Sequence, residues 1–261
     1  MSHVVSTDGT KIVYDRAGSG PSLILVDGAL CSRGFGPSRE FASALSSRFT
    51  VFTYDRRGRG ESGDTKPASK QREIEDLAAL NDAAGGNASV VGFSSGGALA
   101  LEAAAAGVPV RSVVAYETPY VHAATAGDVP DHQQHLDRLI ASGDRGGAVA
   151  YFMRDMVGAP RIAVVMMRLM PWIWGKLKAV AHTLPYDAAV MGDFRVPASR
   201  FGLITTPTLV MHGSKTDERL KAAARAVASA IPTSQHRELE RQNHQVKAAA
   251  LAPVIIEFCG G

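Results

Sequence analysis

Short apolar runs, separated by segments with helical spacing, constrain the fold of this 261-residue chain more than any other feature. At the N-terminus, the β-rich segments 3–7 and 11–15 flank the turn residues Asp8 and Gly9 and predict a hairpin. Further strands are predicted at residues 22–27, 49–55, 88–93, 110–117, 206–213 and 234–240, and helices at residues 39–46, 73–85, 96–107, 218–231 and 251–258. Because most of these strands are apolar throughout and alternate with helices, we predict an α/β fold. It has a mostly parallel sheet of the eight-stranded type, with helices on both faces.

The alternation stops between residues 118 and 205, where the chain is helical and irregular and contains several prolines. We therefore predict an α/β core of residues 1–117 and 206–261, with residues 118–205 as a helical cap insertion over the site. Residues 166–174, MMRLMPWIW, offer flexible sulfur atoms and flat aromatic surface. This cluster predicts an apolar substrate pocket beneath the cap, with simple packing against the core as the alternative.

Residues 92–96, Gly-Phe-Ser-Ser-Gly, match the pattern G-x-S-x-G between a predicted buried strand and a helix of small residues. In this setting the pattern is typical of a nucleophile elbow, which presents its serine on a sharp turn. The neighbours two positions away must be nearly free of side chain, and Ser95 does not have glycine on both sides at that spacing. We therefore predict Ser94 as a nucleophile, with the N–H groups of the following helix favouring developing negative charge.

Three further motifs accompany the elbow. Residues 55–62, Asp-Arg-Arg-Gly-Arg-Gly-Glu-Ser, resemble the D-x-x-G-x-G-x-S turn of the α/β-hydrolase superfamily. Residues 211–213, Met-His-Gly, close a predicted strand, and residues 242–244 read Gln-Asn-His. In this order the chain resembles that superfamily, in its serine hydrolase or esterase type, over nearly its whole length. The resemblance implies the α/β-hydrolase fold and places His244 as the late catalytic histidine.

The resemblance also implies an oxyanion site formed by the backbone N–H groups of Ala29 and Ser95. Relatives usually begin the first of these loops with His-Gly, whereas this chain has Asp27-Gly28. Asp27 either changes the hydrogen bonding of the loop, places a carboxylate near the pocket, or merely caps the loop. Cys31 falls close by, but the sequence supplies no identifiable base for its thiol.

The acid that orients His244 has two candidates. Its usual place in the family, three residues beyond Gly213, holds Thr216 here, and Asp217 comes one residue later. Glu117 ends a predicted strand, which resembles members, including certain haloalkane dehalogenases, whose acid follows the strand after the elbow. Because a carboxylate at the end of a buried strand is unfavourable without a partner, we predict Glu117 as the acid and Asp217 as its rival. A backbone contact at the cap entrance is the alternative role for Glu117.

Other sites find little support in the sequence. Residues 58–63 fit G-x-G-x-x-G, but residues 64–67, Asp-Thr-Lys-Pro, delay the helix that a dinucleotide fingerprint requires. The pair His132 and His135 lacks further ligands, and we expect both to be solvated. We therefore predict no cofactor and no metal.

The charge and the cysteine content limit which partners and which compartment we expect. With 28 basic and 25 acidic residues, and without a Lys/Arg cluster interleaved with aromatics, the chain does not resemble a nucleic-acid-binding protein. We see no signal peptide and no apolar stretch long enough to span a bilayer. Two cysteines without a C-x-x-C pair suit a reducing compartment. These features predict a cytoplasmic protein without a membrane partner, and they leave the oligomeric state open.

Together the motifs predict a serine hydrolase that cleaves a small, apolar ester, lactone or related acyl compound through an acyl-enzyme. A small-molecule substrate is the expected partner. Perhydrolysis or carbon–carbon bond hydrolysis on the same scaffold, and a ligand-binding protein without turnover, are the alternatives.

Overall fold

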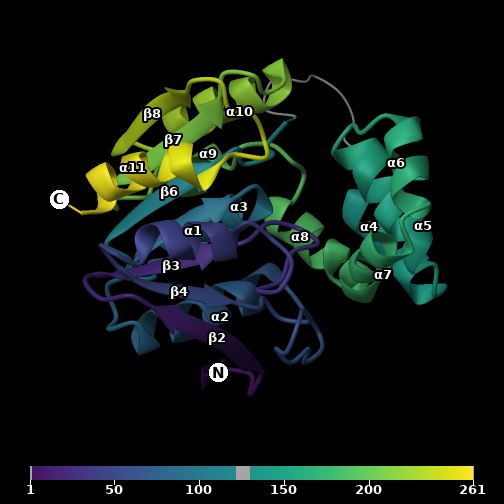
Figure 1. The fold of residues 1–261 in the computed structure, drawn as a ribbon, viewed down its shortest axis with the longest axis horizontal. Helices are drawn as coiled ribbons and strands as arrows, with labels where there is room; N and C mark the ends of the chain where they lie inside the picture. The colour runs from purple at the N-terminus through teal and green to yellow at the C-terminus, as the bar shows by residue number, and fades with distance from the viewer. Residues whose placement is uncertain (1, 122–129, 261) are drawn as a thin grey trace.

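The computed structural model describes residues 2–121 and 130–260, and its centre is an eight-stranded sheet (Figure 1). The strands are β1 (Ser2–Val5), β2 (Lys11–Ala17), β3 (Ser22–Val26), β4 (Thr50–Tyr54), β5 (Ser89–Phe93), β6 (Ser112–Tyr116), β7 (Thr208–Gly213) and β8 (Ser234–Leu239). Their order is β1-β2-β4-β3-β5-β6-β7-β8. β2 pairs antiparallel with β1 and β4, and every other pair is parallel. The mostly parallel eight-stranded sheet is thus confirmed, together with its N-terminal hairpin.

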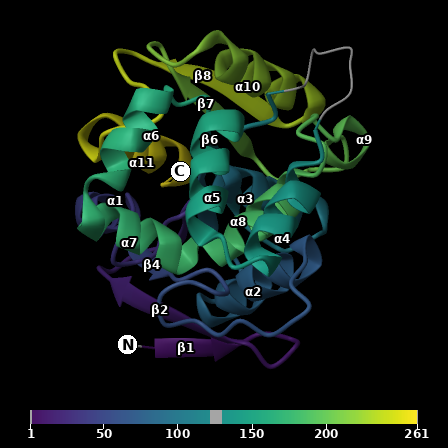
Figure 2. The ribbon, with the colours of Figure 1, turned by 90° about the vertical axis from the view of Figure 1, so that its right-hand side faces the viewer.

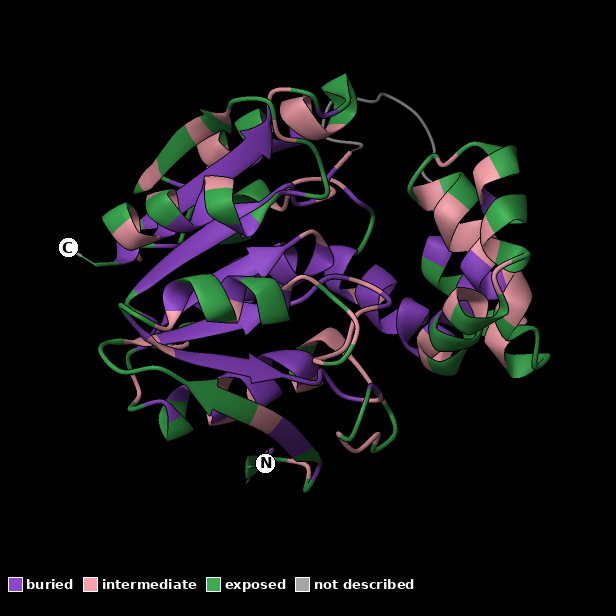
Figure 3. Cartoon of the chain, in the orientation of Figure 1, coloured by how far each residue is buried: buried purple, intermediate pink, exposed green. Residues whose placement is uncertain are grey.

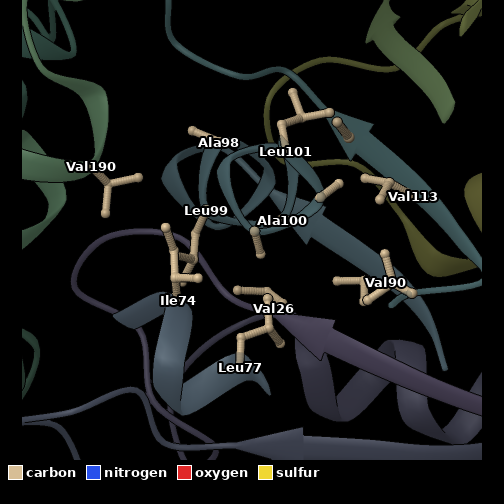
Figure 4. Close-up of a cluster of buried hydrophobic side chains, with 14 of the residues drawn as sticks. Val26, Ile74, Leu77, Val90, Ala98, Leu99, Ala100, Leu101, Val113 and Val190 are labelled. Carbon is tan, nitrogen blue, oxygen red and sulfur yellow. The ribbon is translucent and has the colours of Figure 1, made fainter. Parts of the chain in front are cut away.

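Helices cover both faces of this sheet. The helices of the core are α1 (Ser38–Leu45), α2 (Lys70–Ala83), α3 (Ser95–Ala105), α10 (Glu218–Ala230) and α11 (Ala248–Cys259). Ile24 and Val26 of β3 belong to an apolar cluster with α2, α3 and α10, part of which is drawn in Figure 4. Leu23 and Leu25 belong to a second cluster with α1 and α11. Because successive side chains of a strand point to opposite faces, an apolar run such as β3 is buried on both sides.

Helix α2 begins three residues before its predicted start. Ser69 has an extended backbone, and its side chain accepts a hydrogen bond from the backbone N–H of Arg72. This serine cap satisfies one of the N–H groups that the first helical turn leaves unpaired. The polar residues 70–72 therefore join the helix, although they continue no apolar pattern.

Between β6 and β7 the described chain is helical. This segment contains α4 (His132–Ala141), α5 (Arg145–Tyr151), a π-helical turn (Phe152–Met156), α6 (Arg161–Arg168), α7 (Pro171–Val180), a 3-10 turn (Ala181–Thr183), α8 (Leu184–Met191) and α9 (Ala198–Phe201). Figure 2 looks onto α4 to α7, which lie in front of the core, and Figure 3 shows that they carry more exposed surface than the sheet. The predicted cap, residues 118–205, includes residues 122–129, which lie outside the described residues, and its boundaries stay a prediction. Among the described helices, none is both long and apolar enough to cross a membrane.

The register of the parallel strands brings distant parts of the sequence to one edge of the sheet. Phe93 of β5 lies opposite Tyr116 of β6, and Tyr116 lies opposite Met211 of β7. The residues that follow these strands therefore meet at the carboxyl edge, where open α/β sheets bind their ligands.

Candidate active site

Ser94 lies on the sharp turn between β5 and α3. Its φ angle is +54° and its ψ angle is −124°, a backbone conformation that side-chain-bearing residues rarely adopt. A Cβ atom on Gly92 would lie 2.4 Å from the carbonyl oxygen of Gly96, and a Cβ on Gly96 would lie 2.2 Å from that of Val26. Both glycines of the motif are therefore required by close backbone approach, as the elbow geometry demands.

Glu117 and His244 come together from different ends of the chain. His244 Nδ1 lies 2.8 Å from Glu117 Oε2, although 127 positions separate the two residues. The hydroxyl of Tyr116 donates to the backbone carbonyl of Asn243 at 2.8 Å, which fixes the loop that carries the histidine. Contact with Glu117 leaves Nε2 as the imidazole nitrogen that can exchange a proton with a substrate or nucleophile.

The surroundings of Glu117 favour its ionised form. Its carboxylate is fully buried and also accepts hydrogen bonds from the backbone N–H of Gly213 and from the hydroxyl of Thr216. Burial acts to raise the pKa of Glu117, but the hydrogen bonds from His244, Thr216 and Gly213 outweigh it and hold the pKa below its ordinary value. Its φ angle of +50° adds a second strained backbone position beside Ser94.

Asp217 has a different local role. It is the N-cap of α10, where its carboxylate accepts hydrogen bonds from the backbone N–H groups of Arg219 and Leu220. The side chain also lines a cavity with Ser94. Of the two predicted candidates for the acid, Glu117 is the one whose carboxylate contacts His244.

The predicted oxyanion loop passes directly beside the elbow. A Cβ on Gly28 would lie 3.1 Å from the Cβ of Ser94, so glycine permits this approach. Ala29 and Ser95, whose N–H groups are the predicted donors, line a cavity together with Ser94. The geometry brings these residues together, and their role as donors stays a prediction.

Two buried arginines donate hydrogen bonds to the backbone carbonyl groups of this loop. Arg59 Nη1 donates to the carbonyl of Gly28 at 2.7 Å, and Arg56 Nη1 donates to the carbonyl of Asp27 at 3.2 Å. Both guanidinium groups also contact the carboxylate of Asp187 in α8, at 2.7 and 2.8 Å. Charge-assisted bonds of this kind are stronger than neutral ones, so they restrain the loop.

The carboxylate of Asp187 also reaches the elbow. It accepts the hydroxyl of Ser95 at 2.8 Å, and Arg56 completes the network through two bonds of 2.7 Å to Glu73. Burial acts to raise the pKa of Asp187, but the charges of Arg59 and Arg56 dominate and lower it. Sequence reasoning missed this network. Arginines within the motif of residues 55–62 were its only signal, and nothing in the sequence paired them with an aspartate in a distant helix.

Asp27 and Cys31 lie near the same loop. Asp27 is buried, and neither of its carboxylate oxygens accepts a well-aligned hydrogen bond from the described residues. Burial raises the pKa of Asp27 to about 6, because it outweighs the weak hydrogen bonding from Ser38 and the charges of Arg59 and Arg56. Burial likewise raises the pKa of the Cys31 thiol to about 12, so this cysteine stays protonated near neutral pH and does not suit a nucleophile.

Two cavities, of about 150 and 580 Å³, meet at the elbow. Both are lined by Ala29, Ser94, Phe152, Val157 and His244. The smaller one is also bordered by Met156, Met191 and Phe194, and the larger one by Phe35, Phe93 and Leu177. A substrate held at Ser94 therefore has mostly apolar space on two sides.

The predicted source of this apolar lining was wrong. No residue of the cluster 166–174 borders either cavity; the π-helical turn, α8 and the nearby loops supply the lining instead. Met167, Ile173 and Trp174 pack into the apolar cluster of the helical segment, and Trp172 is 65% exposed. The apolar composition of this cluster indicated burial, but it did not show which side of each helix faces the cavities.

The expected solvation of the two early histidines of α4 was also wrong for one of them. His132 is buried, and its Nδ1 lies 2.8 Å from the hydroxyl of Tyr151. Within residues 2–121 and 130–260, the His, Cys, Asp and Glu side chains form no group of three that could hold a metal ion.

The model of the alpha/beta hydrolase family matches residues 18–255. The chain belongs to this family. An alpha/beta hydrolase from Sphaerobacter thermophilus DSM 20745 is 48% identical, with a TM-score of 0.89, over 98% of this chain and 99% of that one. A search of curated proteins finds no match.

More distant structures share the fold. The enol-lactonase from Burkholderia xenovorans LB400 is 18% identical, with a TM-score of 0.72, over 100% of both chains. A thermophilic esterase from Thermogutta terrifontis is 19% identical, with a TM-score of 0.70, over 99% of this chain and 98% of that one. These likenesses show a shared fold, and the chemistry of the site must be argued from the residues of this chain.

Proposed function

We propose that this alpha/beta hydrolase cleaves a small, apolar ester, lactone or related acyl compound through an acyl-enzyme. Ser94 attacks the carbonyl carbon, and His244 accepts its proton and returns it to the leaving group. Glu117 orients the imidazole and stabilises its charged form. The N–H groups of Ala29 and Ser95 bind the oxyanion, and water then hydrolyses the acyl-enzyme by the same route.

The contact of 2.8 Å between His244 and Glu117, beside a cavity that also holds Ser94, carries this proposal. A buried carboxylate with a lowered pKa stays charged at neutral pH, as a residue that supports an imidazolium ion must. The strained φ angle of Ser94 is a second support, because strain of this kind persists where the surrounding structure enforces it.

A fluorophosphonate probe tests the nucleophile without knowledge of the substrate. We expect labelling of one residue, Ser94, detected by mass spectrometry of the digested protein, and none in Ser94→Ala. Ser95→Ala is the matched control, because its hydroxyl is held by Asp187. A folded protein that takes no label would favour a ligand-binding protein without turnover, and a label elsewhere would reject Ser94.

The apolar lining supports a preference within the ester class. We expect higher kcat/KM for p-nitrophenyl butanoate and hexanoate than for the acetate, because the longer chains bury additional apolar surface at about 0.8 kcal/mol per methylene group. Initial rates with one leaving group throughout measure this preference. Equal or faster hydrolysis of the acetate would contradict the apolar substrate class while leaving the nucleophile untouched.

A further inference from the structure

Helices α6 and α7 expose apolar side chains on their outer side. Of the eight large apolar residues that are exposed in residues 2–121 and 130–260, six lie between residues 157 and 172. Four of them follow the spacing i, i+3, i+4, i+7 and so form a single stripe on or just beyond α6, which Trp172 of α7 extends. This α6–α7 face consists of Ile162, Val165, Met166, Leu169 and Trp172.

Packing within the protein does not require this face. Other residues of the same two helices, Met167, Ile173, Trp174 and Leu177, already fill the apolar cluster of the helical segment. Ile162 and Leu169 nevertheless remain 68% and 70% exposed. Exposed apolar surface that is this concentrated marks a site of interaction with another surface.

The charged residues of the two helices have one sign. Residues 156–186 contain four Lys and Arg residues and no Asp or Glu. Arg161 and Arg168 lie along one edge of the stripe, and Lys176 Nζ lies 6.0 Å from the centre of the Trp172 ring. Cations beside an apolar face, with tryptophan among its residues, are the composition of segments that lie in a membrane interface.

The segment that precedes this face lines the candidate active site. Val157, which is 44% exposed, precedes α6 and lines both cavities at Ser94. Five positions along the chain separate Val157 from Ile162, the first residue of the face.

We infer that the α6–α7 face docks on an anionic lipid surface, with its apolar residues among the acyl chains and Arg161, Arg168 and Lys176 at the headgroups. A second copy of the chain fits less well. In a two-fold dimer this face would meet itself and bring the cations of both copies together. The sequence-based expectation of no membrane partner rested on the length needed to span a bilayer, and peripheral docking does not require that length.

Sedimentation of the full chain with lipid vesicles tests this inference. We expect binding to vesicles of phosphatidylcholine mixed with phosphatidylglycerol, with weaker binding to phosphatidylcholine alone and at high salt. Leu169→Ser/Trp172→Ser should reduce the partition coefficient at least about tenfold. The control Val5→Ser/Leu203→Ser removes two residues of similar exposure elsewhere, 60% and 71%, and should bind as the unaltered protein does.

A second pair of variants tests the charge. Arg161→Gln/Lys176→Gln should lose about fivefold in binding to the anionic vesicles for each charge removed. Arg16→Gln/Arg48→Gln, which changes the net charge equally at exposed positions outside the face, should lose little. Ser94→Ala should bind normally, so the result does not depend on the proposed hydrolysis.

Three results would overturn the inference. The first is no binding to anionic vesicles at low salt, and the second is an equal loss in the control variants. The third is a dimer, seen by sedimentation velocity, that Leu169→Ser/Trp172→Ser dissociates while vesicle binding is unchanged.

Discussion

Two buried carboxylates near the elbow, Glu117 and Asp27, have pKa values that are shifted in opposite directions. Both lose contact with water, which disfavours a charge. Glu117 is compensated by three hydrogen-bond donors, and its pKa falls. Asp27 accepts no well-aligned hydrogen bond from the described residues, the hydrogen bonding from Ser38 is too weak to compensate for burial, and its pKa rises. Both carboxylates are buried, so the difference in their pKa values comes from hydrogen bonding. Glu117 is suited to hold a charge, whereas a charge on Asp27 destabilises the fold.

Asp27→Asn is expected to stabilise the protein near neutral pH. The folded state raises the Asp27 pKa from 3.8 to about 6, so it binds the proton more tightly than the unfolded chain does. The free energy of unfolding therefore falls as pH rises from about 4 to about 6, by up to about 3 kcal/mol, and the loss is complete above that range. Urea unfolding of both proteins at several pH values measures the difference.

The gain from Asp27→Asn should grow with pH across that range and then level off. Asp15→Asn, at a half-exposed side chain, is the control and should show no such growth. A gain that is the same at pH 4 and pH 7 would show that the Asp27 carboxylate is not the source of the effect.

At the level of single residues, the sequence predicted which residues belong to the site better than it predicted which of them contact one another. Counting from Gly213 placed Thr216 where the family has its acid, and the structure has Thr216 donate its hydroxyl to Glu117. The motif and the end of the strand nominated Glu117 ahead of Asp217, without showing which of the two contacts His244. The isolation of Asp27 was not predictable, because it depends on how Gly36 and the start of α1 pack around the carboxylate.

At the level of elements, a buried carboxylate links α8 to two arginines of the core. Asp187 contacts Arg56 and Arg59, and these arginines hold the carbonyl groups of the predicted oxyanion loop. Movement of α8 would therefore be transmitted to the loop beside Ser94. Apolar spacing predicted most helices of the core, but this connection joins residues 128 and 131 positions apart and leaves no local pattern.

Asp187→Asn is expected to be strongly destabilising. The substitution leaves two buried guanidinium groups without their shared counter-charge, and breaking a buried ion pair in this way costs about 3–5 kcal/mol. Asp193→Asn, two residues beyond the end of α8 and 61% exposed, should change stability by no more than about 0.5 kcal/mol. Urea denaturation compares the two. A loss below about 1 kcal/mol in Asp187→Asn would mean that Glu73 alone neutralises the pair.

The sequence did not predict which side of α6 and α7 faces the core, and the reason is a different one. Apolar residues in this segment occur on two sides of each helix, and a repeat of 3.6 residues does not tell which side faces the core. The cluster of residues 166–174 was therefore interpreted as pocket lining, whereas part of it packs inside the helical segment and part lies at the surface.

At the level of the whole molecule, the parallel sheet determines which distant residues meet. β5, β6 and β7 are neighbours, so the elbow, the end of β6 and the loop after β7 share one edge. The alternation of strands and helices and the order of the motifs were enough to predict this arrangement. Which carboxylate reaches His244 required the three-dimensional structure, because Glu117 and Asp217 both lie at this edge.

The ranking of two variants tests whether Ser94, His244 and Glu117 act as one unit. Glu117→Gln should keep the fold and lower kcat about 10²–10⁴-fold, because the imidazolium loses its stabilising charge. Asp217→Asn should lower kcat about tenfold or less, through changes at the start of α10 alone. The measurement is kcat on the best ester substrate, with thermal unfolding of each variant as the check on folding. A folded Glu117→Gln that stays active, beside an Asp217→Asn that loses most of its kcat, would reject Glu117 as the acid.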